Sequence, residues 1–249
     1  MEFTYDWYYN IIKLLIEKGY QFISYEDYEN NYDIIKKCCI LRHDIDYSMK
    51  KIERMLEVEA NLGVFSTWFI QYNSDFYNPF SKKSLSIINK ILSKGGKIGL
   101  HFDETSYDDF ILENPIELKS YVEHEAEMLR RGLGGRPIRV VSMHRPSKKT
   151  LDADFQFDTL VNSYSKKYFK DFKYISDSRM NWREPVEEIV RQGIEPRLHI
   201  LTHPFWYNDV EKNINEAVIE FIANAGKERY NILNENITDL ECIVGKLYD

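Results

Sequence analysis

Short apolar segments alternate with longer amphipathic segments along this chain of 249 residues. The apolar segments are rich in β-branched and aromatic residues and predict strands. They cover residues 21–24, 38–41, 64–70, 97–102, 138–143, 173–176 and 198–202. The amphipathic segments predict helices, which cover residues 5–18, 48–60, 81–93, 116–133, 185–191 and 210–225. Ser48 is the expected N-cap of the second helix, and Gly63 follows its end.

Strands that alternate with helices and lack hairpins pair in parallel, so this order predicts a parallel sheet with helices outside it. Six or seven strand–helix units, without a glycine-rich phosphate loop after the first strand, favour a barrel over an open doubly wound sheet. We therefore expect an α/β fold with a single domain over residues 1–249. The N-terminal helix, at about 5–18, is expected to pack on the barrel.

Charge and composition limit the classes of binding partner and the cellular compartment that we expect for this protein. The net charge of -7 and the absence of a basic stripe argue against a nucleic-acid partner. The first residues do not predict a secretory leader, and no apolar run approaches the ~20 residues of a membrane span. The three cysteines include the adjacent Cys38 and Cys39 and form no disulfide framework. We expect a cytoplasmic protein without a membrane span.

Charged and polar side chains stand at the ends of several predicted strands. Asp44 and Asp46 follow the apolar run 38–41, and alternation with period two places both on the same face of the strand. His101, His144 and His203 each end a further predicted strand; the ends of parallel strands meet where α/β folds place active sites. These side chains are expected to converge.

This set of residues suits metal-assisted hydrolysis. A catalytic zinc takes three ligands from His, Asp or Glu and keeps one position for water, so we expect Asp46, His101 and His144 to bind a divalent metal. Asp44 is the candidate base for the water proton, and Arg145 is expected to hold that carboxylate ionised through a bidentate pair. His203 is the candidate acid, because histidine titrates near neutral pH.

Taken in order, the strand ends resemble the motifs of the polysaccharide deacetylase-like superfamily, also called NodB-homology or carbohydrate esterase family four. The matching segments are His43-Asp44-Ile45-Asp46, Gly99-Leu100-His101, Arg145-Pro146 and Leu201-Thr202-His203. The resemblance implies a distorted (β/α)7 barrel that removes acyl groups from N-acylated sugars with a divalent metal. The family carries a second metal histidine four residues after the first, where this chain has Thr105. Either His144 or an oxygen donor takes that place, or metal binding is weaker.

The leading hypothesis is a metal-dependent deacylase, with zinc as the expected metal, acting on an N-acetyl or N-formyl sugar in a cytoplasmic glycan precursor. Phe205 and Trp206, just after His203, and Trp182 are the candidate substrate contacts. One alternative is a catalytically degenerate protein that binds a glycan or serves as a scaffold in polysaccharide assembly. A second alternative is a metal-free glycoside hydrolase that uses a carboxylate pair such as Asp44 and Asp103.

Overall fold

The computed structural model describes residues 2–31, 36–108 and 114–248. The chain divides into two compact units, Met1–Asp209 and Val210–Asp249. The first unit contains the whole sheet and all the candidate site residues. That residues 1–249 form a single domain stays a prediction.

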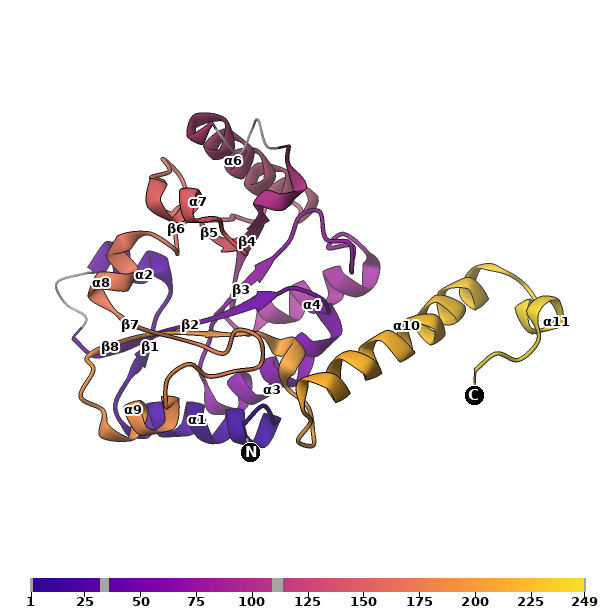
Figure 1. Cartoon of the computed structure of the whole chain (residues 1–249), viewed down its shortest axis with the longest axis horizontal. Helices are drawn as coiled ribbons and strands as arrows, with labels where there is room; N and C mark the ends of the chain where they lie inside the picture. The colour runs from indigo at the N-terminus through magenta and orange to yellow at the C-terminus, as the bar shows by residue number, and fades with distance from the viewer. Residues whose placement is uncertain (1, 32–35, 109–113, 249) are drawn as a thin grey trace. The chain divides into compact units, whose positions relative to one another are not determined.

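The first unit is built on one sheet, and the strand pairs among its described residues are all parallel (Figure 1). Its strands are β1 (Gln21–Phe22), β2 (Cys38–Ile45), β3 (Thr67–Ile70), β4 (Lys97–Asp103), β5 (Val140–His144), β6 (Val161–Asn162), β7 (Lys173–Ser176) and β8 (Arg197–Thr202). The order along the sheet is β6-β5-β4-β3-β2-β8-β7, and β1 pairs with the first residues of β2. Within the described residues the sheet curls but stays open between β6 and β7. This confirms the predicted α/β class and the distorted seven-stranded barrel.

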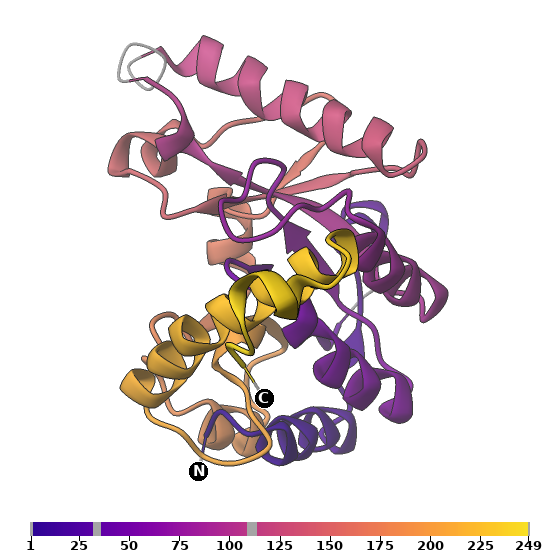
Figure 2. The ribbon, with the colours of Figure 1, turned by 90° about the vertical axis from the view of Figure 1, so that its right-hand side faces the viewer.

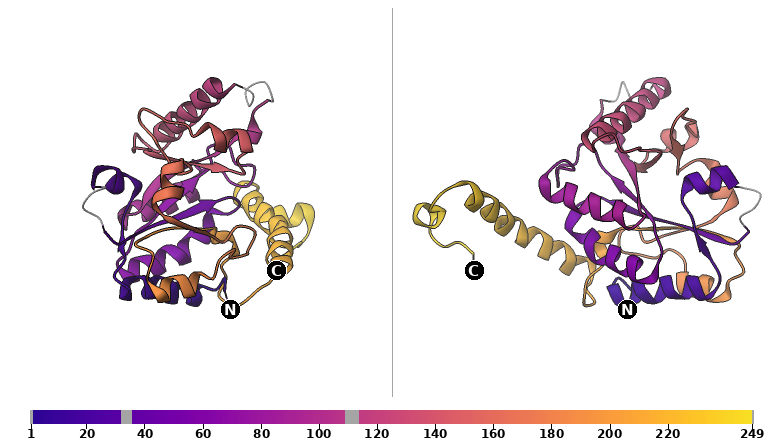
Figure 3. Two further views of the ribbon diagram at one scale, coloured as in Figure 1. Left: turned by 60° about the vertical axis from the view of Figure 1, so that its left-hand side comes forward. Right: turned by 180° about the vertical axis from the view of Figure 1, so that it is seen from behind.

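Helices and short 3-10 turns connect the strands. In the first unit they are α1 (Tyr5–Glu17), α2 (Tyr25–Asn31), η1 (Met49–Lys51), α3 (Ile52–Leu62), α4 (Lys82–Ser93), η2 (Glu104–Ser106), α6 (Pro115–Gly132), α7 (Lys148–Ala153), α8 (Lys166–Asp171), α9 (Val186–Gln192) and η3 (Pro204–Trp206). Helix α1 packs against α3 and α9, and α6 packs along β4 (Figures 2 and 3). The helices of these contacts lie outside the curled sheet.

Local signals explain where several helices begin and end. Thr4 accepts a hydrogen bond from the backbone of Trp7 at the start of α1, and Ser81 does the same for Ser84 in α4. Gly63 ends α3 in the left-handed conformation, as expected. Ser48 is a correction: the chain continues from it through the 3-10 turn η1 into α3, and its side chain makes no capping bond.

Aromatic residues of α2 and α8 fill the interior of the sheet near the amino ends of its strands. Tyr25 and Tyr28 of α2 belong to one buried cluster with inward-facing strand residues, which also includes Ile23, Cys38, Ile40, Phe69, Val140, Tyr168 and Phe172. Gly99 of β4 belongs to this interior, because a Cβ atom there would lie 2.5 Å from the ring of Phe69. The carboxyl ends of the strands are thereby left for the polar residues.

The second unit consists of α10 (Ile214–Asn236) and α11 (Leu240–Val244). A capping box begins α10, in which the side chains of Asn213 and Glu216 each bond the other's backbone. The helix is longer than the predicted 210–225. In the part of the chain that the structure describes, no helix is both long enough and apolar enough to cross a membrane.

Candidate metal centre at the strand ends

Strand β2 places a column of residues on the inner face of the sheet. Ile40 packs in the interior cluster, so alternation with period two turns Arg42, Asp44 and then Asp46 in the same direction, toward the strand ends. The intervening His43 faces the other way. His43 Nε2 lies 2.6 Å from Glu59 Oε1 of α3.

Asp46, His101 and His144 come together from β2, β4 and β5. His101 Nε2 lies 3.1 Å from Asp46 Oδ1, His144 Nδ1 lies 3.2 Å from the same oxygen, and the two nitrogens are 3.1 Å apart. The group can hold a metal ion. In a tetrahedral zinc site with bonds of about 2.0–2.1 Å, ligand atoms lie about 3.3–3.4 Å apart. The triangle of donor atoms therefore fits a divalent metal closely.

Electrostatics keep Asp46 in its ligating form. Burial alone would raise the pKa of Asp46, but its hydrogen bonds with His101 and His144 and the charge of His203 outweigh burial and hold the pKa well below its usual range. A carboxylate that stays ionised beside two imidazoles is the donor set that borderline metals such as zinc prefer.

Thr105 stands where the family pattern has a histidine, and it contacts the metal group indirectly, through Asp103. Its backbone N–H and its Oγ1 both donate to Asp103 Oδ1, at 3.0 and 2.7 Å. Asp103 Oδ2 lies 3.8 Å from His144 Nε2, the ring nitrogen on the other side from Asp46. Carboxylates behind metal-bound histidines fix the orientation of the ring. Thr105 thus holds the group that faces the back of His144.

Arg145 is a correction to the predicted partner of Asp44. Its guanidinium contacts Asp103 Oδ2 at 3.1 Å and Thr105 Oγ1 at 3.3 Å, and its side chain is 65% exposed. Its backbone turns the chain away from β5 with a φ of 45°, in the left-handed region. The carboxylate that Arg145 binds therefore belongs to the outer rim of the site.

The guanidinium beside Asp44 belongs to Arg42. Arg42 Nη2 donates to Asp44 Oδ2 at 2.7 Å, and both side chains are buried. Burial would raise the pKa of Asp44, but the charges of Arg42, His101 and His203 together outweigh burial and lower the pKa. Sequence reasoning missed Arg42, although its spacing of two residues from Asp44 was a sufficient signal in a strand.

His203 is oriented by Asp177, which follows β7. His203 Nδ1 contacts Asp177 Oδ1 at 2.6 Å, and the backbone N–H of His203 donates to Asp177 Oδ2 at 3.0 Å. His203 Nε2 lies 3.9 Å from Asp46 Oδ2, on the side of the metal group. Burial would lower the pKa of His203, but the charge and hydrogen bond of Asp177 raise it to about 9. His203 is thus held as a proton donor at neutral pH.

The three predicted substrate contacts lie in different surroundings. Phe205 and Trp206 are buried in η3, and the ring of Phe205 packs against Tyr47 with centroids 4.8 Å apart. Trp182 instead stacks on Phe3 and packs against Trp7 of α1. Of the three, Phe205 contacts a neighbour of Asp46. That these residues bind substrate stays a prediction.

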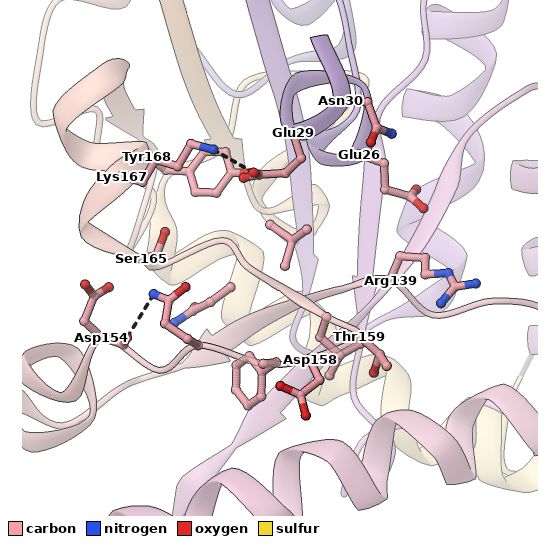
Figure 4. Close-up of a pocket in the computed structure, with 15 residues that line it drawn as sticks. Glu26, Glu29, Asn30, Arg139, Asp154, Asp158, Thr159, Ser165, Lys167 and Tyr168 are labelled. Atoms are coloured by element: carbon pink, nitrogen blue, oxygen red, sulfur yellow. Dashed lines mark hydrogen bonds and ion pairs between the residues drawn. The ribbon is translucent and has the colours of Figure 1, made fainter. Parts of the chain in front are cut away.

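A separate cavity of about 660 Å³ lies at the β6 end of the sheet. It is lined by α2, α8 and the segment around β6, and Figure 4 shows Lys167 and Tyr168 directed toward Glu29. Acidic and basic residues mix in its wall, among them Arg139 and Asp158. The metal group is formed by other strand ends, so we assign this cavity no part in its chemistry.

If His144 is the third ligand, replacing it should weaken metal binding more than replacing the carboxylate behind it. We expect Asp103→Asn to lower Zn²⁺ affinity about 10–100-fold, and His144→Ala to lower it further. Competition with a chromophoric chelator measures both. His124→Ala, which removes an exposed histidine of α6, is the matched control and should bind normally. Normal affinity in His144→Ala would contradict this ligand set.

No family model and no curated protein matches the chain. Solved structures do match it at low identity. An esterase of carbohydrate esterase family 4 from Streptococcus mutans is 16% identical, with 86% of this chain and 88% of that chain covered and a TM-score of 0.46. A family 4 carbohydrate esterase from Bacillus anthracis is 17% identical, with 87% and 86% covered and a TM-score of 0.44.

A pseudoenzyme of the same family from Bacillus anthracis is 16% identical, with a TM-score of 0.41. There, 78% of this chain is matched, but the match spans only 62% of the other. These structural matches are to carbohydrate esterase family 4 at low sequence identity, the family whose motifs the strand ends of this chain resemble.

Proposed function

We propose that this chain is a metal-dependent deacylase that removes an N-acetyl or N-formyl group from a sugar of a cytoplasmic glycan precursor, with zinc as its metal. The observation that carries the proposal is the placement of two proton-transfer groups at the metal group. Asp44 Oδ2 lies 3.9 Å from His101 Nε2, and His203 Nε2 lies 3.9 Å from Asp46 Oδ2. A base and an acid beside one metal position are what amide hydrolysis requires.

A divalent metal held by Asp46, His101 and His144 would polarise the amide carbonyl and activate water near neutral pH. Asp44, whose carboxylate lies 3.9 Å from His101 of the metal group, accepts the proton of the attacking water. His203 donates its Nε2 proton to the amine nitrogen as the C–N bond breaks. The products are a free amino sugar and a carboxylate.

Aromatic rings support a sugar as the substrate. Tyr47, the residue after Asp46, packs edge-on against Phe76 with ring centroids 5.0 Å apart and also contacts Phe205. The side chain of Phe76 is 53% exposed. Ligand pockets use such aromatic faces for contact and a few polar groups for orientation. We propose that the apolar face of the sugar ring packs on Phe76.

The proposal is tested by incubating the protein with UDP-N-acetylglucosamine and, separately, with tetra-N-acetylchitotetraose. Release of acetate and of a free amine is expected for at least one of them. Activity should disappear after treatment with a chelator and return on addition of Zn²⁺, because the metal supplies the electrophile.

The other outcomes separate the alternatives. Full activity in chelator would overturn the metal mechanism and favour a hydrolase that uses carboxylates alone. Failure to bind a stoichiometric metal, together with no turnover, would instead favour a glycan-binding or scaffold protein.

A further inference from the structure

We propose that Arg42 is a positioning residue that fixes the direction of the Asp44 carboxylate beside the metal group. The inference rests on the proposed function, in which Asp44 is the base. Arg42, a residue of β2, thus takes the role of arginine partner to the Asp44 carboxylate that was predicted for Arg145.

The guanidinium of Arg42 is anchored at three points. Its Nη2 donates to Asp44 Oδ2 at 2.7 Å and to Ser142 Oγ of β5 at 2.8 Å, and its Nη1 donates to Ser163 Oγ at 2.9 Å. Ser163 follows β6, so the contacts join β2 to two strands across the sheet. Arg42 and both serines are buried. Because its planar donor group is bonded to residues of three segments, the guanidinium of Arg42 is held in one orientation.

Aromatic rings hold the plane of the guanidinium from the sides. Its central carbon lies 5.2 Å from the centroid of the Phe69 ring and 4.9 Å from that of Tyr164. These distances are those of cation–π contacts. Lysine at this position would keep the charge but lose both the fork of donors and the stacking, so geometry and charge can be separated by experiment.

The two carboxylate oxygens of Asp44 differ in their hydrogen-bond partners. Oδ2 accepts from Arg42 at 2.7 Å and from Ser142 Oγ at 3.2 Å, which occupies its lone pairs within the protein. Oδ1 is buried and has no hydrogen-bond partner among the described residues. A buried carboxylate oxygen without a partner is costly unless it serves a ligand. The contacts on Oδ2 therefore set the direction in which the Asp44 carboxylate lies beside His101 of the metal group.

Arg145 does not take this part in the structure. Its guanidinium lies at the exposed rim and is engaged by Asp103 and Thr105. Arg42 is instead buried and donates to Asp44 and to the two serines. Asp44 is thus positioned by Arg42, a residue of the same strand.

The test compares Arg42→Lys with Ser163→Ala, which removes one anchor and leaves the ion pair intact. Steady-state kinetics use whichever of the two N-acetyl sugars the wild type hydrolyses. We expect Arg42→Lys to lower kcat up to about 10²-fold, because a displacement near 1 Å costs that much, with KM changed less than about twofold. Ser163→Ala should lower kcat less than Arg42→Lys does and leave KM unchanged. Arg197→Lys, a partly buried arginine of β8 that bonds Tyr28, is the matched control.

Two further measurements separate positioning from general support of the fold. Zn²⁺ affinity should be unchanged in Arg42→Lys, and in an Asp44→Asn background Arg42→Lys should lower kcat no further. Equal losses of kcat with and without Asp44, or a kcat that survives both Arg42→Lys and Ser163→Ala, would overturn the proposal.

A crystal structure of Arg42→Lys gives a result that does not depend on activity. A carboxylate of Asp44 turned away from its wild-type direction supports the positioning part, and an unmoved carboxylate refutes it. If the wild type hydrolyses neither sugar, the proposed function fails, and the direction of Asp44 still decides the part of Arg42.

Discussion

Asp44→Asn is expected to lower kcat by about 10²–10⁴-fold, the contribution of a well-placed general base. Asparagine has nearly the same shape as aspartate but cannot accept a proton at neutral pH. The metal ligands Asp46, His101 and His144 are untouched, so Zn²⁺ content should remain at the wild-type level. The kcat and the bound metal are measured on the same preparation, and normal turnover with full metal content would show that Asp44 is not the base.

The same substitution is also expected to destabilise the fold. Asp44 is paired with the buried guanidinium of Arg42, and leaving one charge of a buried pair alone costs about 3–5 kcal/mol. Unfolding in urea measures this loss. The double variant Asp44→Asn with Arg42→Met removes both charges and is expected to recover most of the stability without recovering turnover. That result would assign the loss of kcat to the base and not to a weakened fold.

The convergence of the metal group could be predicted from the sequence because it depends on topology alone. Asp46, His101 and His144 each end an apolar run, and parallel strands bring such ends to one edge. The elements that sequence reasoning missed are short and rich in polar or tyrosine residues. Helix α2 (Tyr25–Asn31) has no apolar period, and β6 has two residues. Their place is fixed by contacts across the sheet.

The partners of the site residues were harder to predict, for two different reasons. Arg42 lies in a buried run, where a charged residue is unusual. The period-two alternation that places Asp44 and Asp46 on one face of the strand also places Arg42 there, and this signal was overlooked. Arg145 was assigned through a motif, but the direction of its side chain depends on the left-handed turn of its own backbone. Thr105 illustrates the same point, since its contact with Asp103 comes from a local 3-10 turn.

Asp177→Asn is expected to shift the pH dependence of turnover. The charge and hydrogen bond of Asp177 raise the pKa of His203 from 6.5 to about 9 against the opposing effect of burial. His203 must be protonated to act as the acid, so the alkaline limb of kcat should lie near its pKa. Removing the charge of Asp177 takes away the largest effect that opposes burial, while Asp46 and Asp44 still raise the pKa of His203, and the limb moves to lower pH. A tenfold fall of kcat at pH 8 corresponds to a pKa of His203 lowered from about 9 to about 7.

The effect on stability has a defined sign. Because the pKa of His203 is higher in the folded chain than its ordinary 6.5, the stabilisation is complete below that value and is lost as the pH rises through about 9. Asp177→Asn should therefore cost more stability near pH 6 than near pH 10, which unfolding in urea at both values measures.

A bound divalent cation would lower the alkaline limb in the wild type and in Asp177→Asn alike, so the difference between them is the quantity to compare. His203→Ala is the control, because it should lack this limb altogether. If Asp177→Asn keeps the wild-type limb while its kcat falls equally at every pH, Asp177 orients the ring without setting its charge. An alkaline limb that persists in His203→Ala would instead place the proton donor in another group.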